Sequence, residues 1–143
     1  MCGIASRQVG AVYTVFEDDA FLVHLPRYVR SWGQITVIPK VHATSFDDLG
    51  RDAWNRTADL AYVASQVQRR LLTPLRTFLA STGSAGGEKL NTSEHVHMHV
   101  VPVFDANERP RDIFSWRDGV YVAEAHEWED LERACQAAWR ELT

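Results

Sequence analysis

The 143-residue sequence has only two cysteines and no apolar run long enough to cross a membrane, which takes about 20 residues. Cys2 and Cys135 stand near opposite ends without CxxC spacing, which argues against a disulfide framework and against a cysteine-rich zinc module. Residues 1–10 lack the basic start and apolar stretch of a secretory signal. We therefore expect a cytoplasmic protein with reduced cysteines and no membrane partner.

The sequence also lacks an excess of positive charge. Fifteen Lys and Arg residues stand against 19 Asp and Glu residues, so the formal net charge is −4. A protein that binds a nucleic acid polymer usually carries a basic surface, and we expect no such partner here. With 45% hydrophobic residues and neither repeat nor linker, the chain is expected to form a single domain over residues 1–143.

Short β-prone runs interrupted by one long helical pattern predict an α+β domain. The expected architecture is a mainly antiparallel five-stranded sheet, with one long helix packed on it and a C-terminal helix. The acidic segment 17–19 separates the first two β-prone runs and is typical of a hairpin turn. The expected strands are residues 11–16, 20–25, 35–38, 75–80 and 95–103.

Two segments show the three-to-four-residue periodicity of an amphipathic helix. The first is predicted over residues 44–72, because Thr44 and Ser45 are candidate caps and Asp47 and Asp48 suit the positive end of a helix dipole. The second is predicted over residues 129–142. The apolar stripes are Leu60, Val63, Ala64, Val67 and Leu71 in the first, and Leu131, Ala134, Cys135, Ala138 and Leu142 in the second.

Three histidines, His95, His97 and His99, alternate with apolar residues. Because side chains on a strand point alternately to its two faces, the histidines are expected to share one face, with Val96 and Met98 facing the long helix. Neighbouring imidazoles disfavour one another's protonation, which favours neutral rings with an available lone pair. We expect the three rings to line an open cleft on an internal strand.

Two kinds of site fit such a histidine row, a nucleophilic site and a metal site. A stable zinc site normally needs three or four convergent ligands, often with a carboxylate or thiolate nearby. Glu94 is expected on the opposite face, and no other Cys or Asp has suggestive spacing. We therefore favour a nucleophilic histidine with no metal and no cofactor, and a zinc-dependent hydrolase is the lesser alternative.

The segment from His95 to Val101 resembles the signature of the histidine triad (HIT) superfamily, His-apolar-His-apolar-His-apolar-apolar, at every position. A second segment, Val-Ile-Pro-Lys-Val-His at residues 37–42, is similar to the family's strand-ending motif. With the hairpin and the long helix, the resemblance covers about residues 10–104. Residues 105–143 are then a C-terminal extension.

The resemblance implies a nucleotide hydrolase or nucleotidyl transferase, with a small nucleotide, expected to be a purine nucleoside phosphate, as its substrate. In the family the middle histidine attacks the α-phosphorus of a nucleoside phosphate or dinucleoside polyphosphate and forms a covalent nucleotidyl-histidine, and His97 matches it here. His95 corresponds to the residue that orients the nucleophile. His99 and His42 correspond to residues that hold phosphate oxygens or assist the leaving group.

Five further residues are candidates for binding the nucleotide. Thr92 and Asn91 match positions where relatives carry a phosphate-binding Ser or Thr and a Gln. His24 is the nearest polar residue to the position from which relatives hold the ribose. Lys89 is a candidate contact for a polyphosphate tail and Trp32 for stacking on the base, although a solvated loop lysine and a packed tryptophan are the structural alternatives.

The first four residues, Met-Cys-Gly-Ile, resemble the start of class II glutamine amidotransferases, in which removal of Met exposes a catalytic cysteine. That family needs a much larger αββα domain, with Arg-Gly and Asn-Gly elements that this sequence lacks. We interpret Cys2 as an incidental residue of the terminus.

A non-catalytic nucleotide-binding or regulatory HIT protein is the other alternative. The intact triad favours an enzyme, because binding alone does not need a nucleophile at position 97. Four reactions are open to this chemistry: phosphoramidate hydrolysis, dinucleoside polyphosphate hydrolysis, phosphorolysis and nucleotidyl transfer. The resemblance further implies a two-fold homodimer in which strands and long helices meet.

Overall fold

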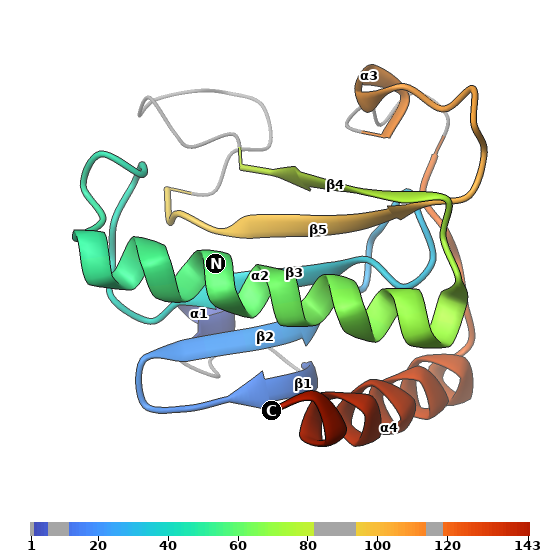
Figure 1. Cartoon of the computed structure of the whole chain (residues 1–143), viewed down its shortest axis with the longest axis horizontal. Helices are drawn as coiled ribbons and strands as arrows, with labels where there is room; N and C mark the ends of the chain where they lie inside the picture. Colours follow the sequence, from blue (N-terminus) through green and yellow to red (C-terminus); the bar gives the residue numbers. More distant parts are fainter. Residues whose placement is uncertain (1, 6–11, 82–93, 114–118) are drawn as a thin grey trace.

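A five-stranded antiparallel sheet forms the centre of the molecule (Figure 1). The computed structural model describes residues 2–5, 12–81, 94–113 and 119–143. The strand order is β1-β2-β3-β5-β4, so β5 is internal and β1 and β4 are the edges. The strands are β1 (Tyr13–Glu17), β2 (Phe21–Leu25), β3 (Ile35–Pro39), β4 (Arg76–Ala80) and β5 (Met98–Val103). The predicted α+β fold is confirmed.

Two long helices cover the sheet. Helix α2 (Arg51–Leu72) crosses one face, and helix α4 (Ala125–Leu142) lies along β1 and contacts α2 (Figure 1). Two helices are single turns, α1 (Cys2–Ala5) and α3 (Pro110–Ile113). Among the described residues, no helix is both long enough and apolar enough to span a bilayer.

The strands present different chemistry on their two faces. On the helix-covered face, alternate residues of β2, β3 and β5 join apolar residues of α2 and α4 in the main core. On the other face, His24, Thr36 and His99 are register partners on β2, β3 and β5, so they form one row across the sheet. We call these three residues the polar row. Because buried polar side chains need hydrogen-bond partners, this face of the sheet is not a purely apolar core.

Helix α2 begins at Arg51, whereas the sequence predicted a start at residue 44. The side chains of Thr44 and Ser45 donate to the carboxylate of Asp48, at 2.8 and 3.4 Å, and neither residue caps the helix. These bonds close a turn before the helix, and the Thr44 hydroxyl lowers the pKa of Asp48. Gly50 is the cap residue. The prediction was wrong because capping side chains also form local turns.

Two other boundaries differ from the sequence prediction. Strand β5 begins at Met98 and not at residue 95, because the chain before it pairs with the loop after β3, with Val96 N donating to Ala43 O at 2.6 Å. Helix α4 begins at Ala125 and not at residue 129, because Glu124 and Glu127 form a capping box.

Helix α4 completes the core and covers the edge strand β1. Trp128 stacks on Tyr13 and Trp139 on Phe16, at ring-centroid distances of 5.9 and 5.2 Å. These two tryptophans, and not the expected Ala134 and Leu142, carry much of the buried face, and Leu142 is 41% exposed. The Gln136 amide donates to the Thr14 carbonyl at 2.6 Å, so α4 also satisfies a backbone group of this edge strand.

A buried glutamine connects α2 to the strands behind the histidines. The Gln68 side chain, 1% exposed, donates to the carbonyls of Gly33 and Val100 at 2.9 and 2.8 Å. Gly33 has a φ of +78°, and a Cβ there would lie 2.1 Å from Cδ1 of Leu72. The positive φ favours glycine at this position, and a Cβ there would also displace the Leu72 side chain of α2.

We expect Gly33→Ala to lower the free energy of unfolding by about 2–4 kcal/mol, from the positive φ and from overpacking against Leu72. Gly119→Ala is the matched control, because Gly119 has a φ of +83° but nothing within 4 Å of its Cβ position. That variant should lose only about 1–2 kcal/mol in urea unfolding. Equal losses in the two variants would show that the approach of α2 is not a constraint.

Candidate active site

The ring of His97 is oriented by the backbone two residues before it. Its Nδ1 lies 2.9 Å from the carbonyl oxygen of His95. A carbonyl oxygen can only accept, so Nδ1 carries the proton and donates it to that bond. In the neutral ring the other nitrogen, Nε2, is therefore left with its lone pair, which is the nitrogen that can attack an electrophile.

The partner of that lone pair is His99. The two Nε2 atoms are 3.1 Å apart, and the rings meet edge to face with centroids 4.6 Å apart. Because His97 Nε2 accepts, His99 Nε2 has to donate, and Nδ1 of His99 is then an acceptor. The Gln34 amide nitrogen lies 3.0 Å from this Nδ1, and the Thr36 hydroxyl lies 3.4 Å from it.

His95 and His42 are the other two histidines beside this pair. The Nε2 atom of His95 donates to the carbonyl of Pro39 at 2.7 Å, which ties the histidine segment to the end of β3. The ring of His42, which is exposed, meets that of His95 edge to face at 5.4 Å. His95 is 2% exposed, so it supports the site from below while His42 lies at its rim.

Burial keeps the central rings neutral. It lowers the pKa of His97, and it lowers the pKa of His99 to about 4, helped by the neighbouring His97 and His24. Burial also lowers the pKa of His95. Since the ordinary value is 6.5, all three rings are uncharged near pH 7, the state in which Nε2 of His97 is nucleophilic.

The expectation of an open cleft needs correction. His97 is only 7% exposed and His99 is half-buried. His97 is not part of any apolar cluster of the described residues, and its neighbours are polar groups of the polar row and the chain before β5. Of the two apolar residues that alternate with the histidines, Met98 packs in the core with α2, and Val96 packs in a small cluster with Ala43 and Leu49.

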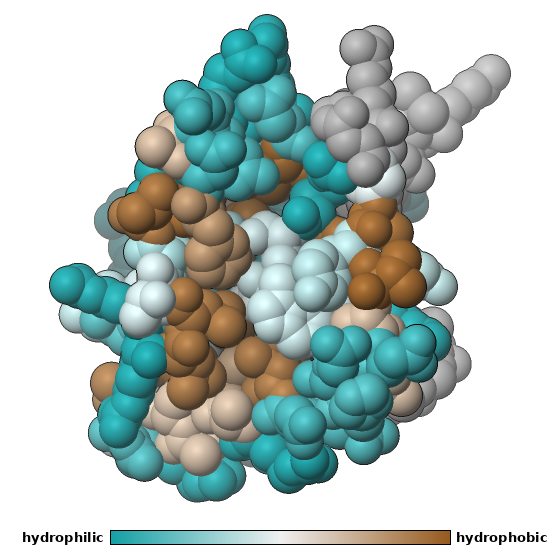
Figure 2. All heavy atoms as spheres, turned by 90° about the vertical axis from the view of Figure 1, so that its right-hand side faces the viewer, coloured by the Kyte–Doolittle hydropathy of each residue, from teal (hydrophilic) through white to brown (hydrophobic). Residues whose placement is uncertain are grey.

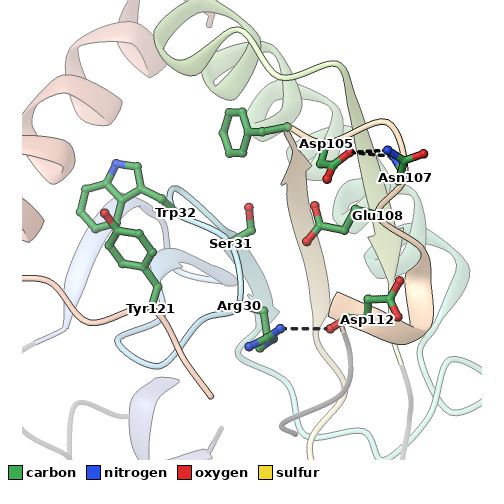
Figure 3. A pocket seen from close by; sticks show the side chains of 9 residues that line it. Arg30, Ser31, Trp32, Asp105, Asn107, Glu108, Asp112 and Tyr121 are labelled. Atoms are coloured by element: carbon green, nitrogen blue, oxygen red, sulfur yellow. Dashed lines mark hydrogen bonds between the residues drawn. The ribbon is translucent and has the colours of Figure 1, made fainter. Parts of the chain in front are cut away.

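A cavity of about 480 Å³ lies elsewhere, at the other end of β5. Figure 3 shows the rings of Trp32 and Tyr121 on one side of it, and Asp105, Glu108 and Asp112 on the other. At about 3.3 Å per strand residue, its wall at Asp105 is about 20 Å along the strand from His99. Trp32 packs on Tyr121 and Trp128 at 5.0 and 4.6 Å, so the structure gives it a packing role apart from the histidines.

The model for the HIT domain matches residues 11–106 of this sequence. The chain belongs to the HIT family. An uncharacterized 16.1 kDa HIT-like protein from Mycoplasma pneumoniae is 28% identical over 105 residues, which cover 73% of this chain and 70% of that protein.

Solved HIT structures have the same fold. A hypothetical histidine triad nucleotide-binding protein from Sulfolobus tokodaii strain7 superposes with a TM-score of 0.78 at 23% identity, covering 99% of this chain and 91% of the other. A Zn-bound histidine triad family protein from Mycobacterium smegmatis gives 0.75 at 22% identity, covering 99% and 92%. Helix α4 lies outside the matched range of the HIT model but within the superposed fold.

Of the remaining expected nucleotide contacts of this HIT domain, His24 is the one that lies in the described part of the chain. His24 is 3% exposed and lies in the polar row, two strands from His99. Lys89, Asn91 and Thr92 lie outside the described residues. Within the described ranges, no three His, Cys, Asp or Glu side chains are arranged to hold a metal ion.

Sequence reasoning missed Gln34, Thr36 and Gln68. Gln34 and Thr36 lie just before the Val-Ile-Pro-Lys-Val-His segment at residues 37–42, which pointed to His42 alone as a site residue. Gln68 is one of several polar residues in an amphipathic helix pattern. The available signal was register: with β3 paired to β5, residue 36 falls opposite position 99. Strand pairing is not readable from a single sequence, so this signal was not usable alone.

The lowered histidine pKa values predict how stability depends on pH. As pH falls from 6.5 towards 4, the unfolded chain takes up protons before the folded HIT domain does, so the free energy of unfolding should decrease. His99→Gln removes one such group and should weaken this decrease by up to about 3 kcal/mol. Denaturant unfolding at several pH values measures it. His126→Gln, at the exposed histidine on α4, is the control variant, and an effect there equal to that of His99→Gln would contradict the assignment.

Proposed function

We propose that this HIT domain is a nucleotide hydrolase or nucleotidyl transferase that uses His97 as its nucleophile. The observation that carries the proposal is the bond between His97 Nδ1 and the His95 carbonyl, because it leaves Nε2 unprotonated. The family includes hydrolases and transferases, which agrees with this chemistry. The expected substrate is a small nucleoside phosphate, phosphoramidate or dinucleoside polyphosphate.

The reaction takes two displacements at the α-phosphorus. In the first, the Nε2 lone pair forms an N–P bond while the bond from phosphorus to the leaving oxygen or nitrogen breaks. The ring then carries a positive charge, and the His95 carbonyl dipole on Nδ1–H stabilises it. In the second, water or another acceptor attacks the phosphorus, the N–P bond breaks, and His97 returns to its neutral form.

His99 is suited to serve the leaving group or the phosphate oxygens. Its Nε2–H points at the reacting nitrogen from 3.1 Å, so a phosphate bound at His97 would meet this donor. His42 at the rim is proposed to contact phosphate, and His95 to orient the nucleophile through its carbonyl. His24, Asn91 and Thr92 stay proposed contacts for the nucleotide, Lys89 for a polyphosphate tail and Trp32 for a base.

We expect His97→Asn and His97→Ala to abolish turnover while leaving the fold and much of the nucleotide affinity, because the surrounding donors remain. His99→Ala and His42→Ala should be milder, each losing about 2–4 kcal/mol of transition-state stabilisation. The measurement is kcat and KM with a panel of a nucleoside phosphoramidate, a dinucleoside polyphosphate, and a nucleoside diphosphate sugar offered with phosphate. His126→Asn is the control and should keep wild-type activity.

Three outcomes of the panel would contradict parts of the proposal. Substantial turnover by His97→Ala would show that water attacks directly. Tight nucleotide binding without turnover on any substrate would favour the regulatory alternative. Activity that is lost on chelation and restored only by zinc would favour a metallohydrolase, and the nucleophile proposal predicts that activity survives chelators.

We also propose a two-fold homodimer formed through α2 and the edge strand β4. Large exposed hydrophobic residues occur on both elements and in the turn that joins them, and Figure 2 shows apolar patches at the end of the molecule where α2 finishes. The exposed hydrophobic residues of these two elements and of the turn between them are Tyr62, Leu71, Leu75 and Leu79, which are 36–66% exposed. An edge strand beside such residues offers unpaired backbone and apolar area to a second copy.

Light scattering at micromolar concentration should give twice the 16.2 kDa mass of the chain. Leu79→Asp should shift the protein towards the monomer, because it puts a charge into the proposed apolar contact. Val122→Asp is the control, since Val122 is 85% exposed and lies on neither element. A wild-type mass near 16.2 kDa would count against the dimer.

A further inference from the structure

We propose that Gln34 is a positioning residue that holds His99 in the tautomer with its proton on Nε2. The Gln34 amide nitrogen lies 3.0 Å from His99 Nδ1, and Gln34 is 8% exposed, so the contact is shielded from water. Nothing in the histidine motif assigns a role to this residue. It reaches His99 from the start of β3, 65 residues earlier in the chain.

The argument rests on the order of donors and acceptors along one line of contacts. At one end, the His95 carbonyl requires a proton on His97 Nδ1. His97 Nε2 therefore accepts, and the 3.1 Å contact requires a donor on His99 Nε2. A neutral His99 then has a lone pair on Nδ1, and only an N–H or O–H can bond to it. The amide of Gln34 supplies an N–H at that point.

The opposite tautomer would break this line. If Gln34 presented its oxygen to His99, Nδ1 would be protonated and Nε2 would carry a lone pair facing that of His97. Two lone pairs 3.1 Å apart repel unless an added proton lies between them, which would make one of the two rings cationic and engage the nucleophilic pair of His97. A cationic ring is disfavoured there by burial. The donor orientation of Gln34 is thus the one that leaves His97 reactive.

Thr36 is the competing donor, and its geometry is weaker. Its hydroxyl lies 3.4 Å from His99 Nδ1, near the limit for a hydrogen bond. A hydroxyl can rotate to donate or accept, so it adapts to either tautomer of His99. Gln34 makes the shorter contact, and with its nitrogen 3.0 Å from His99 Nδ1 its N–H donates to the lone pair of the tautomer that has its proton on Nε2.

The backbone on both sides of the contact is held from the other face of the sheet. Gln68 of α2 donates to the carbonyls of Gly33 and Val100, which are the chain neighbours of Gln34 and His99. Ile35 and Val100 are register partners on β3 and β5. These bonds fix where Gln34 and His99 begin, so their side chains meet with little conformational freedom.

The consequence for the reaction rests on the proposed function. With Nε2–H on His99, a phosphate bound at His97 meets a hydrogen-bond donor, whereas the other tautomer would present a lone pair to phosphate oxygens. A misplaced proton therefore costs transition-state stabilisation more than binding of the nucleoside. We expect Gln34→Met, which keeps the length but removes the donor, to lower kcat about tenfold with little change in KM.

The direct test is ¹⁵N NMR of the histidine rings at a pH above 7, which distinguishes protonated from unprotonated ring nitrogens. His99, assigned by the loss of its signals in His99→Gln, should have Nε2 protonated in the wild type. In Gln34→Met the two tautomers should mix. In Gln34→Glu the carboxylate should draw the proton to Nδ1. Gln136→Met is the control, because the amide of Gln136 is a hydrogen-bond donor as well but contacts Thr14 and not a histidine.

A wild-type spectrum with Nδ1 of His99 protonated would overturn the proposal without any variant. An unchanged tautomer in both Gln34 variants would also overturn it. If protonation of His99 Nε2 were lost in Thr36→Val alone, the role would belong to Thr36. The tautomer is measured in the resting protein, so failure of the proposed reaction and failure of this inference are separate results. If the panel shows no turnover, the NMR result still decides the role of Gln34.

Discussion

One hydrogen bond, from His97 Nδ1 to the carbonyl of His95, determines the chemistry available to the rest of the site. It decides which ring nitrogen holds the lone pair, and it places a carbonyl dipole where positive charge develops if that lone pair attacks. Because donor and acceptor lie two residues apart on one segment, the bond depends on the backbone path before β5. That path is held by His95 on Pro39 and by Val96 on Ala43.

The sheet supports this bond from both faces. On the helix side, apolar residues of α2 and the two hydrogen bonds donated by the Gln68 side-chain amide hold β3 against β5. On the histidine side, burial makes charge costly, so the rings of His97 and His99 stay neutral. The hydrogen bond between them then runs from His99 Nε2–H to the lone pair of His97 Nε2.

The strands and the two long helices were predictable from the sequence because their periodicity is strong, and β5 was correctly expected to be internal. Their starts were not, since Thr44 and Ser45 cap a turn around Asp48 and Glu124 is an unusual cap for α4. The motif identified the histidines, but it also predicted three equivalent rings on one strand face. His95 instead lies before β5, in a segment that pairs with the loop after β3, and its ring bonds to the Pro39 carbonyl. Gln34 depends on strand register, which a single sequence does not contain.

The central claim is that His97 carries the nucleotidyl group between two displacements. Intact-mass measurement after millisecond mixing with a nucleoside phosphoramidate, quenched without acid, tests it most directly. The account predicts a mass increase equal to one nucleotidyl group, located on His97 by peptide mapping, present in His126→Asn and absent in His97→Asn. Turnover of the same substrate with no adduct at any mixing time, or an adduct on another residue, would contradict it.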